Sequence, residues 1–123
     1  MNVKIVASRN FRNESKKLLK KYVSLKKEFT ELNKKLQKNP YLGDPIGKKC
    51  FKIRLAVKSK GKGKSGGLRV ITYVVFKIRK IADELIKVNL ISTYDKSEFE
   101  TISNKDLIRL IKEVEEEEEE QQQ

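Results

Sequence analysis

The sequence predicts an α+β domain, with an antiparallel, mixed-edge sheet of about four strands, an N-terminal helical hairpin and a C-terminal helix. Three observations carry this prediction. Apolar residues recur at helical spacing over residues 10–36, the spacing changes to two from residue 50, and helical spacing returns after Ser103. The expected element order is β-α-α-β-β-β-α, with the helices against one face of the sheet and the other face partly open.

The first half of the chain is predicted to form a strand followed by two helices. Residues 2–7 alternate and are rich in β-formers, and the first helix is expected over residues 10–21. Ser24 is a suitable N-cap for the second helix, and Asn39-Pro40 ends it because a residue before proline is pushed out of the α region. The buried stripe of this helix consists of Leu25, Phe29, Leu32 and Leu36. So short a link between two helices predicts an antiparallel hairpin.

After a turn-rich link at 41–47, the second half is predicted to form strands and one helix. Strands are expected at residues 50–58, 68–78 and 86–94. In the first of these, the apolar residues from Phe51 to Val57 point one way, whereas Lys52 and Arg54 point the other way. Residues 58–67, KSKGKGKSGG, cannot fill a core and should form an exposed cationic loop of a hairpin. Ser103, with Asp106 three residues later, opens the last helix in an arrangement that resembles a capping box.

The chain carries a formal net charge of +12, and its charges are unevenly distributed. Residues 113–123 contain seven glutamates and no basic residue, whereas residues 45–82 contain twelve Lys or Arg and no acidic residue. Such a density of positive charge attracts polyanions, so nucleic acid is the expected partner. We divide the chain into a domain at 1–114 and an acidic, low-complexity tail at 115–123, which is expected to be frayed or disordered. A tail of this charge could also fold back on the basic face when no partner is bound.

Several chemistries are excluded by what the sequence lacks. With no histidine and one cysteine, the chain has no His/Cys zinc site, imidazole base or internal disulfide, and we expect Cys50 to be an inert, half-buried residue. Gly61, Gly63 and Gly66 fit G-x-G-x-x-G, but a strand follows instead of a helix, so neither a dinucleotide site nor a P-loop is expected. The chain lacks an apolar run that could span a membrane and a signal peptide, which predicts a cytoplasmic protein. No metal and no cofactor are expected.

Cationic and phenolic side chains occur on all three later strands. They are Lys52 and Arg54 on the first, Arg69 and Tyr73 on the second, and Tyr94 and Lys96 at the end of the third. If these strands pair, the side chains line a groove suited to phosphoryl chemistry on RNA, because cations offset the charge of the phosphate in the transition state. A lysine crowded by other cations has a lowered pKa and can act as a base toward a ribose 2′-hydroxyl, and tyrosines can stack on bases. The loop lysines are expected to bind phosphates instead: Lys58, Lys60, Lys62 and Lys64.

Most of these residues also have a structural interpretation. Lys52 and Arg54 could be the polar side of a half-exposed strand, and Tyr73 could be a core residue with its hydroxyl at the rim. Tyr94 has the parity of the apolar residues Val88 and Leu90, which does not fit a groove position unless the strand ends before it. Arg69, flanked by small and apolar residues, is hard to explain as surface decoration.

The segments FKIRLAVKSKGKGKSGGLRVITYVV (51–75) and NLISTYDKSEFETIS (89–103) resemble the RelE/HigB-type toxins of bacterial toxin–antitoxin pairs, within the RelE/ParE superfamily. The order of elements agrees over nearly the whole chain except the glutamate tail. The resemblance implies a RelE-like fold and a metal-independent, ribosome-dependent mRNA endonuclease that a cognate antitoxin protein silences. By position, the resemblance places Lys52 and Arg54 at the basic sites of the strand before the loop. It places Arg69 at the arginine that opens the next strand and Lys96 at the basic residue after the last strand. Tyr94 approximately matches the catalytic tyrosine of the family.

Two other functions remain compatible with the sequence. A ParE-like toxin would inhibit gyrase without cleaving nucleic acid, although ParE-like chains lack the concentrated cations at Lys52, Arg54, Arg69 and Lys96. A plain RNA-binding or ribosome-associated module would bind phosphates with the same residues and catalyse nothing. If the protein binds RNA, either as the endonuclease or as the non-catalytic module, the helix lysines would add long-range attraction to ribosomal RNA.

Overall fold

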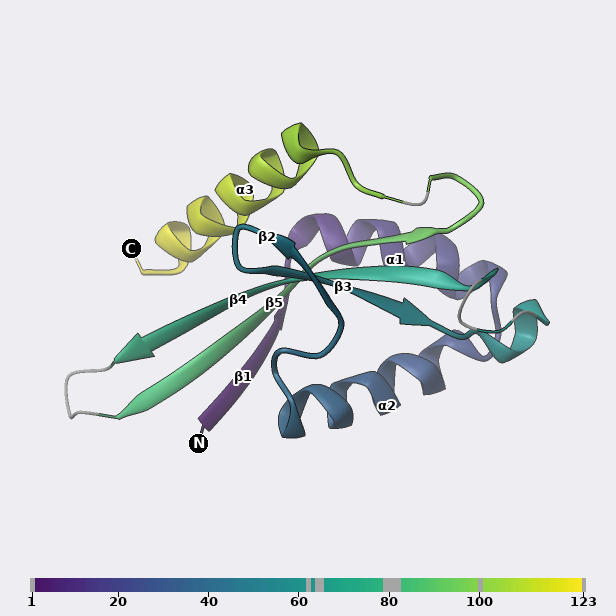
Figure 1. The fold of residues 1–123 in the computed structure, drawn as a ribbon, viewed down its shortest axis with the longest axis horizontal. Coiled ribbons are helices and arrows are strands. Elements are labelled where there is room, and N and C mark those ends of the chain that lie inside the picture. Colours follow the sequence, from purple (N-terminus) through teal and green to yellow (C-terminus); the bar gives the residue numbers. More distant parts are fainter. Residues whose placement is uncertain (1, 62, 64–65, 79–82, 100, 123) are drawn as a thin grey trace.

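The computed structural model describes residues 2–61, 63, 66–78, 83–99 and 101–122 of the chain. Within these ranges one five-stranded sheet, of order β1-β5-β4-β3-β2, is combined with three α-helices (Figure 1). The elements are β1 (Asn2–Ala7), α1 (Arg9–Lys21), α2 (Leu25–Lys38), β2 (Asp44–Gly47), β3 (Cys50–Leu55), a 3₁₀ turn (Lys58–Lys60), β4 (Leu68–Ile78), β5 (Glu84–Asp95) and α3 (Asn104–Gln122). In the described part of the chain, no helix is both long and apolar enough to cross a membrane.

The sheet confirms the predicted α+β class. β1 pairs with β5 in parallel at one edge, and every other strand pair is antiparallel. The sheet has one strand more than the four predicted: β2 lies in the segment 41–47, for which the sequence predicts a turn-rich link. Its sequence DPIG contains proline and glycine, which disfavour strands, but an edge strand tolerates a proline. Pairing with β3, with Asp44 opposite Lys52, supplies the stability that local propensity lacks.

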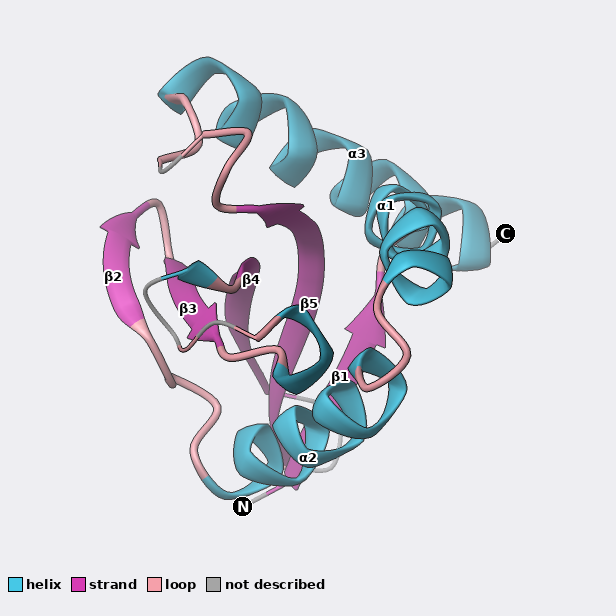
Figure 2. Ribbon diagram, turned by 90° about the vertical axis from the view of Figure 1, so that its right-hand side faces the viewer, coloured by secondary structure: helices cyan, strands magenta, loops and turns pink. Residues whose placement is uncertain are grey.

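Helices cover both faces of the sheet, so the prediction of helices on one face only was wrong. On the first face, α1 and α2 run in opposite directions and bury Phe11, Leu32 and Leu36 against β1, β3, β4 and β5 (Figure 1). On the second face, α3 buries Leu107, Leu110 and Val114 against Ile71 and Ile91, together with Cys50 and Tyr94. Figure 2 shows the strands lying between α3 and α2. The second face is apolar at its centre, since Cys50, Ile71 and Ile91 are almost fully buried.

The helix starts follow the expected capping chemistry at two of three positions. The Ser8 hydroxyl accepts a hydrogen bond from the backbone N–H of Phe11 (3.1 Å) and begins α1. The Ser103 hydroxyl accepts one from Asp106 N–H (3.1 Å), which confirms the predicted start of α3. Ser24 stands at the N-cap position of α2 but makes no side-chain capping bond, because its hydroxyl bonds with Glu28 and Ser59 instead.

The acidic tail is helical to Gln122, so the prediction of a frayed or disordered segment was wrong. The boundary between residues 114 and 115 lies inside α3. Glutamate side chains from this part of the helix pair with basic residues of distant elements: Glu117 and Glu120 with Arg9, and Glu118 with Lys77 and Lys87. These partners are far away in sequence, which is why composition alone could not reveal the order of the tail.

The junction between the cationic loop and β4 leaves room only for glycine at position 67. A methyl group at Gly67 would overlap the backbone carbonyl oxygen of Leu55, which can move only if β3 moves. We expect Gly67→Ala to lower the free energy of unfolding by at least about 2 kcal/mol in urea denaturation. Gly63→Ala is the control, because a methyl group there meets no atom within 4 Å, and it should change stability by less than about 1 kcal/mol. Equal effects of the two substitutions would contradict this packing.

Candidate nucleic-acid interface

Three of the predicted site residues lie in one row across the sheet. In the strand register, Arg54 of β3 stands opposite Arg69 of β4, and Arg69 stands opposite Tyr94 of β5. Lys52 belongs to the neighbouring row on the same face, opposite Ile71. Directly opposed residues lie about 5 Å apart, so these side chains can act on one small group. We call the three residues of this row, together with the adjacent Lys52, the cationic row: Lys52, Arg54, Arg69 and Tyr94.

The position of Tyr94 depends on a β-bulge. Ile71 stands opposite Ser92 but Thr72 stands opposite Leu90, so Ile91 is an extra residue in β5. The extra residue shifts the alternation of side chains by one. Val88 and Leu90 therefore face α1 and α2, whereas Tyr94 shares the second face with Arg69. The alternation that places Tyr94 on the same face as Val88 and Leu90 in the sequence is interrupted at Ile91, so Tyr94 lies on the opposite face from them.

Of the two other predicted residues, Tyr73 stands apart from the row and Lys96 lies close to it. Tyr73 is opposite Cys50 and Asn89, four residues along β4 from Arg69, which is about 13 Å at 3.3 Å per residue. Burial, followed by the negative charges of Glu115 and Glu118, raises the pKa of Tyr73, so its hydroxyl stays protonated at neutral pH. Lys96 follows β5 directly and is exposed, while its backbone N–H donates to the carbonyl of Gly67 (3.2 Å). Lys96 thus stands near the row, and Tyr73 does not.

The row is covered at one end and open at the other. Arg69 is 1% exposed, Tyr94 2% and Lys52 8%. The ring of Phe99 stacks on Tyr94 with 4.0 Å between centroids, and Ile102 packs into the same apolar cluster beside α3. At the β3 end, the half-exposed Arg54 donates to the Asp44 carboxylate at 3.0 Å. A ligand can therefore reach Arg54 directly, whereas Arg69 and Tyr94 are covered in this conformation.

The cationic loop is attached to the same end of the sheet by an ion pair between the partly buried Lys60 and the buried Asp95. Lys60 Nζ donates to Asp95 Oδ1 (2.6 Å) and to the carbonyl of Gly66 (2.7 Å), and the Tyr22 hydroxyl donates to Asp95 Oδ2 (2.7 Å). Burial alone would raise the pKa of Asp95, but the hydrogen bonds from Lys60, Ser97 and Tyr22 hold it well below its usual range. Lys60 therefore has a structural role in this conformation.

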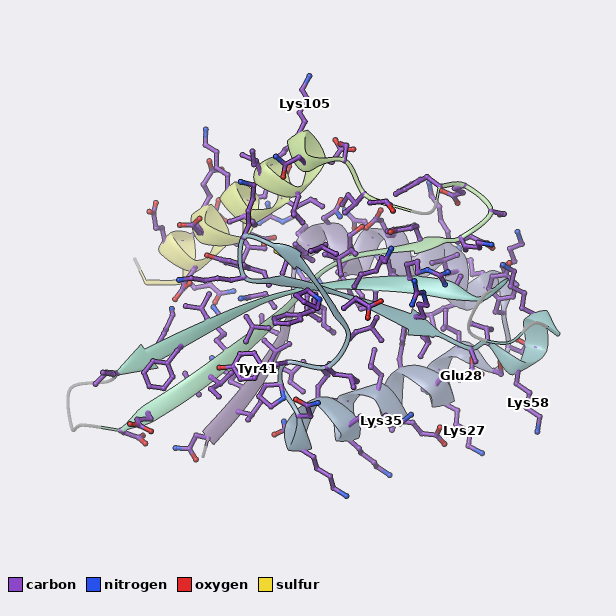
Figure 3. The ribbon with its side chains drawn as sticks, in the orientation of Figure 1. Lys27, Glu28, Lys35, Tyr41, Lys58 and Lys105 are labelled. Atoms are coloured by element: carbon purple, nitrogen blue, oxygen red, sulfur yellow. The ribbon has the colours of Figure 1, made fainter. Side chains whose placement is uncertain are left out.

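Of the other loop lysines predicted to bind RNA, Lys58 lies among the described residues. Lys58 is exposed and extends away from the sheet (Figure 3), while its backbone N–H donates to the Glu28 carboxylate at 2.6 Å. Lys62 and Lys64 lie outside the described residues. A second basic surface covers the outer sides of α1 and α2, where Lys27 and Lys35 are among the exposed lysines (Figure 3). Its members are Arg12, Lys16, Lys17, Lys20, Lys21, Lys26, Lys27, Lys34, Lys35 and Lys38.

Three residues near the row were not identified from sequence. Asp95 holds the loop and Phe99 covers Tyr94. Glu14 accepts hydrogen bonds from the edge of β5 beyond Leu90, where the pairing with β1 ends. The Glu14 carboxylate accepts hydrogen bonds from Ser92 Oγ (2.9 Å) and from Thr93 N–H (3.2 Å). Burial raises its pKa, although these hydrogen bonds lower it in part. Helical spacing offered a signal for Glu14, because it lies three residues after the buried Phe11 and four before the buried Leu18.

Neither metal binding nor thiol chemistry is indicated in the described part of the chain. No group of three or more acidic, cysteine or histidine side chains there could hold a metal ion. Burial raises the pKa of the Cys50 thiol to about 12, so the thiol is protonated at neutral pH and is a poor nucleophile. What the cationic row can do chemically is bind and polarise a phosphate.

The Lys60–Asp95 pair predicts a specific pH dependence of stability. The folded-state pKa of Asp95 lies below its ordinary value of 3.8, so its stabilisation is present above that value and is lost as the pH falls below it. We expect Asp95→Asn to lower the free energy of unfolding by about 3 kcal/mol at pH 7 and to flatten its decline below about pH 4. Asp44→Asn breaks the exposed pair with Arg54 and should cost less than about 1 kcal/mol. Urea unfolding across pH measures both, and equal losses at pH 7 would contradict the role of Asp95.

No protein-family model matches the chain, and no curated protein matches it. The function is therefore inferred from the sequence resemblance at 51–75 and 89–103, the cationic row, the loop attached beside it and the distribution of charge.

Proposed function

We propose that the chain is a toxin of the RelE/HigB type, which cleaves mRNA on translating ribosomes in the cytoplasm and is silenced by a cognate antitoxin. One observation carries the proposal: Arg54, Arg69 and Tyr94 lie side by side on three adjacent strands, with Lys52 in the next row. The sequence resemblance and the strand pairing point to the same residues. The first rests on the order of amino acids at 51–75 and 89–103, and the second on the register of β3, β4 and β5.

In the proposed reaction, the ribose 2′-oxygen bonds to the adjacent phosphorus, and the bond from phosphorus to the 5′-oxygen of the next nucleotide breaks. The 2′-hydroxyl loses its proton to a base on the protein, and an acid supplies a proton to the departing 5′-oxygen. Arg54 and Arg69 bind the phosphate and offset its added charge in the transition state. Lys52, Lys96 and Tyr94 are the candidates for the two proton transfers. Tyr73 is too far along β4 to take part in this conformation.

The second basic surface supports the ribosomal setting of the reaction. The ten members of that surface lie on α1 and α2, which pack on the opposite face of the sheet from the row, so they can contact ribosomal RNA while the row holds mRNA. Burial of Arg69 and Tyr94 favours one competing function, an RNA-binding module without catalysis. The two functions differ in one requirement, since cleavage needs the segment that carries Phe99 to move away from Tyr94.

Mapping of new mRNA 5′ ends tests the proposal. The protein is induced in a bacterium that carries translated and untranslated copies of one reporter mRNA, and cuts are expected only in the translated copy. Arg54→Gln and Lys96→Gln change exposed residues and should each lower cleavage about 100-fold, because each removes a charge that acts on the reacting phosphate. Lys105→Gln, at the exposed start of α3, removes the same charge and should cut as well as the unaltered protein (Figure 3).

Each competing function predicts a different result in the same experiment. Growth arrest with intact mRNA would indicate a gyrase inhibitor. Intact mRNA that copurifies with ribosome-bound protein would indicate a non-catalytic module. Cleavage at the full rate by both Arg54→Gln and Lys96→Gln would show that neither residue acts on the reacting phosphate, which would contradict the proposal.

A further inference from the structure

The glutamate-rich end of α3 occupies basic groups of three other elements. Glu117 Oε1 accepts a hydrogen bond from the backbone N–H of Arg9 at 2.8 Å, and Glu120 pairs with the Arg9 guanidinium at 3.3 Å. Glu118 pairs with Lys77 of β4 and, at 3.4 Å, with Lys87 of β5. The carboxylates of the chain itself therefore bind at the start of α1 and on the second face of the sheet.

This part of α3 is a poor helix on its own. Six consecutive glutamates, at 115–120, place like charges three and four residues apart, which destabilises a helix. The last turn contains no basic residue, so negative charge accumulates at the negative end of the helix dipole. Beyond Val114, the last buried apolar residue of the helix, the order of the last two turns depends on the three cations.

The six glutamates differ in their surroundings. Glu117 and Glu118 are half-buried, with side chains 17% and 26% exposed, and Glu120 pairs with Arg9 at the surface. Hydrogen bonding to Lys77 and the charge of Lys87 lower the pKa of Glu118, although burial opposes them. Glu115, Glu116 and Glu119 are exposed and have no ion pair with any described residue. The chain thus offers two sets of three glutamates with equal charge and different contacts.

We propose that the glutamate-rich end of α3 is an autoinhibitory polyanion, which competes with RNA phosphates for Arg9, Lys77 and Lys87. The inference rests on the proposed function in one respect, since RNA is taken as the competing polyanion. RNA binding releases the last two turns of α3, because a helix so destabilised by its own charge separates once its cations have other partners.

A binding measurement with two charge-matched variants tests this competition. One variant changes Glu117, Glu118 and Glu120 to Gln, and the other changes Glu115, Glu116 and Glu119 to Gln. The probe is a short fluorescent single-stranded RNA with 2′-O-methyl riboses, which cannot be cleaved, and fluorescence anisotropy gives the Kd at low salt. We expect the first variant to bind about 10-fold more tightly than the second, and the difference to shrink as salt is raised. Equal affinities of the two variants would overturn the inference, because net charge alone would then explain any gain.

A second measurement does not depend on those variants. Amide hydrogen exchange of the unaltered protein should become at least about 10-fold faster over residues 115–122 when the same RNA is bound, because these residues lose their ion pairs. Unchanged or slower exchange there with bound RNA would also overturn the inference. Both readouts are independent of cleavage, so a protein that binds RNA in this way and cuts nothing would contradict the proposed function and leave the competition intact.

Discussion

The bulge at Ile91 is the constraint on which both the fold and the candidate site depend. Before it, β5 pairs with β1 as far as Leu90 opposite Ala7, and its alternate residues fill the core beneath α1 and α2. After it, β1 has ended, and α1 lies along the edge of β5, where Glu14 binds Thr93 N–H. The added residue turns Tyr94 toward Arg69 and Asp95 toward Tyr22 and Lys60. One inserted residue thus sets the cationic row on one face and the anchor of the cationic loop on the other.

Positive charge serves two purposes in this protein, and burial separates them. Lys60, Lys77 and Lys87 are paired with carboxylates of the chain, and the Lys60–Asp95 pair is buried. The exposed lysines of α1 and α2, with Lys58 and Lys96, remain at the surface for a partner. The net charge of the chain therefore overstates the positive charge that is available to a polyanion in the free protein. The cationic row stands between these classes, because Arg54 is accessible while Arg69 and Tyr94 are covered.

The elements that could be predicted from sequence are those with a strong local pattern. The β-branched run at 68–78 forms β4 with the predicted bounds, and Ser103 caps α3 as expected. Features that depend on distant partners could not be predicted. The strand β2 exists because β3 lies beside it, the order of the acidic tail comes from Arg9, Lys77 and Lys87, and the position of Tyr94 depends on a bulge that leaves no mark on the alternation before it. Residue chemistry identified the members of the row, but only strand register shows which of them are neighbours.

Arginine side-chain NMR during titration with an uncleavable 2′-O-methyl RNA tests the central claim, that RNA binds at the row on the second face. Each guanidinium reports its own environment, and Arg109, paired with Glu113 on α3, serves as an internal control. The account predicts that the Arg54 and Arg69 signals shift at saturation while the Arg109 signal does not. Saturation with unchanged Arg54 and Arg69 signals would contradict it, because the RNA would then bind away from the row.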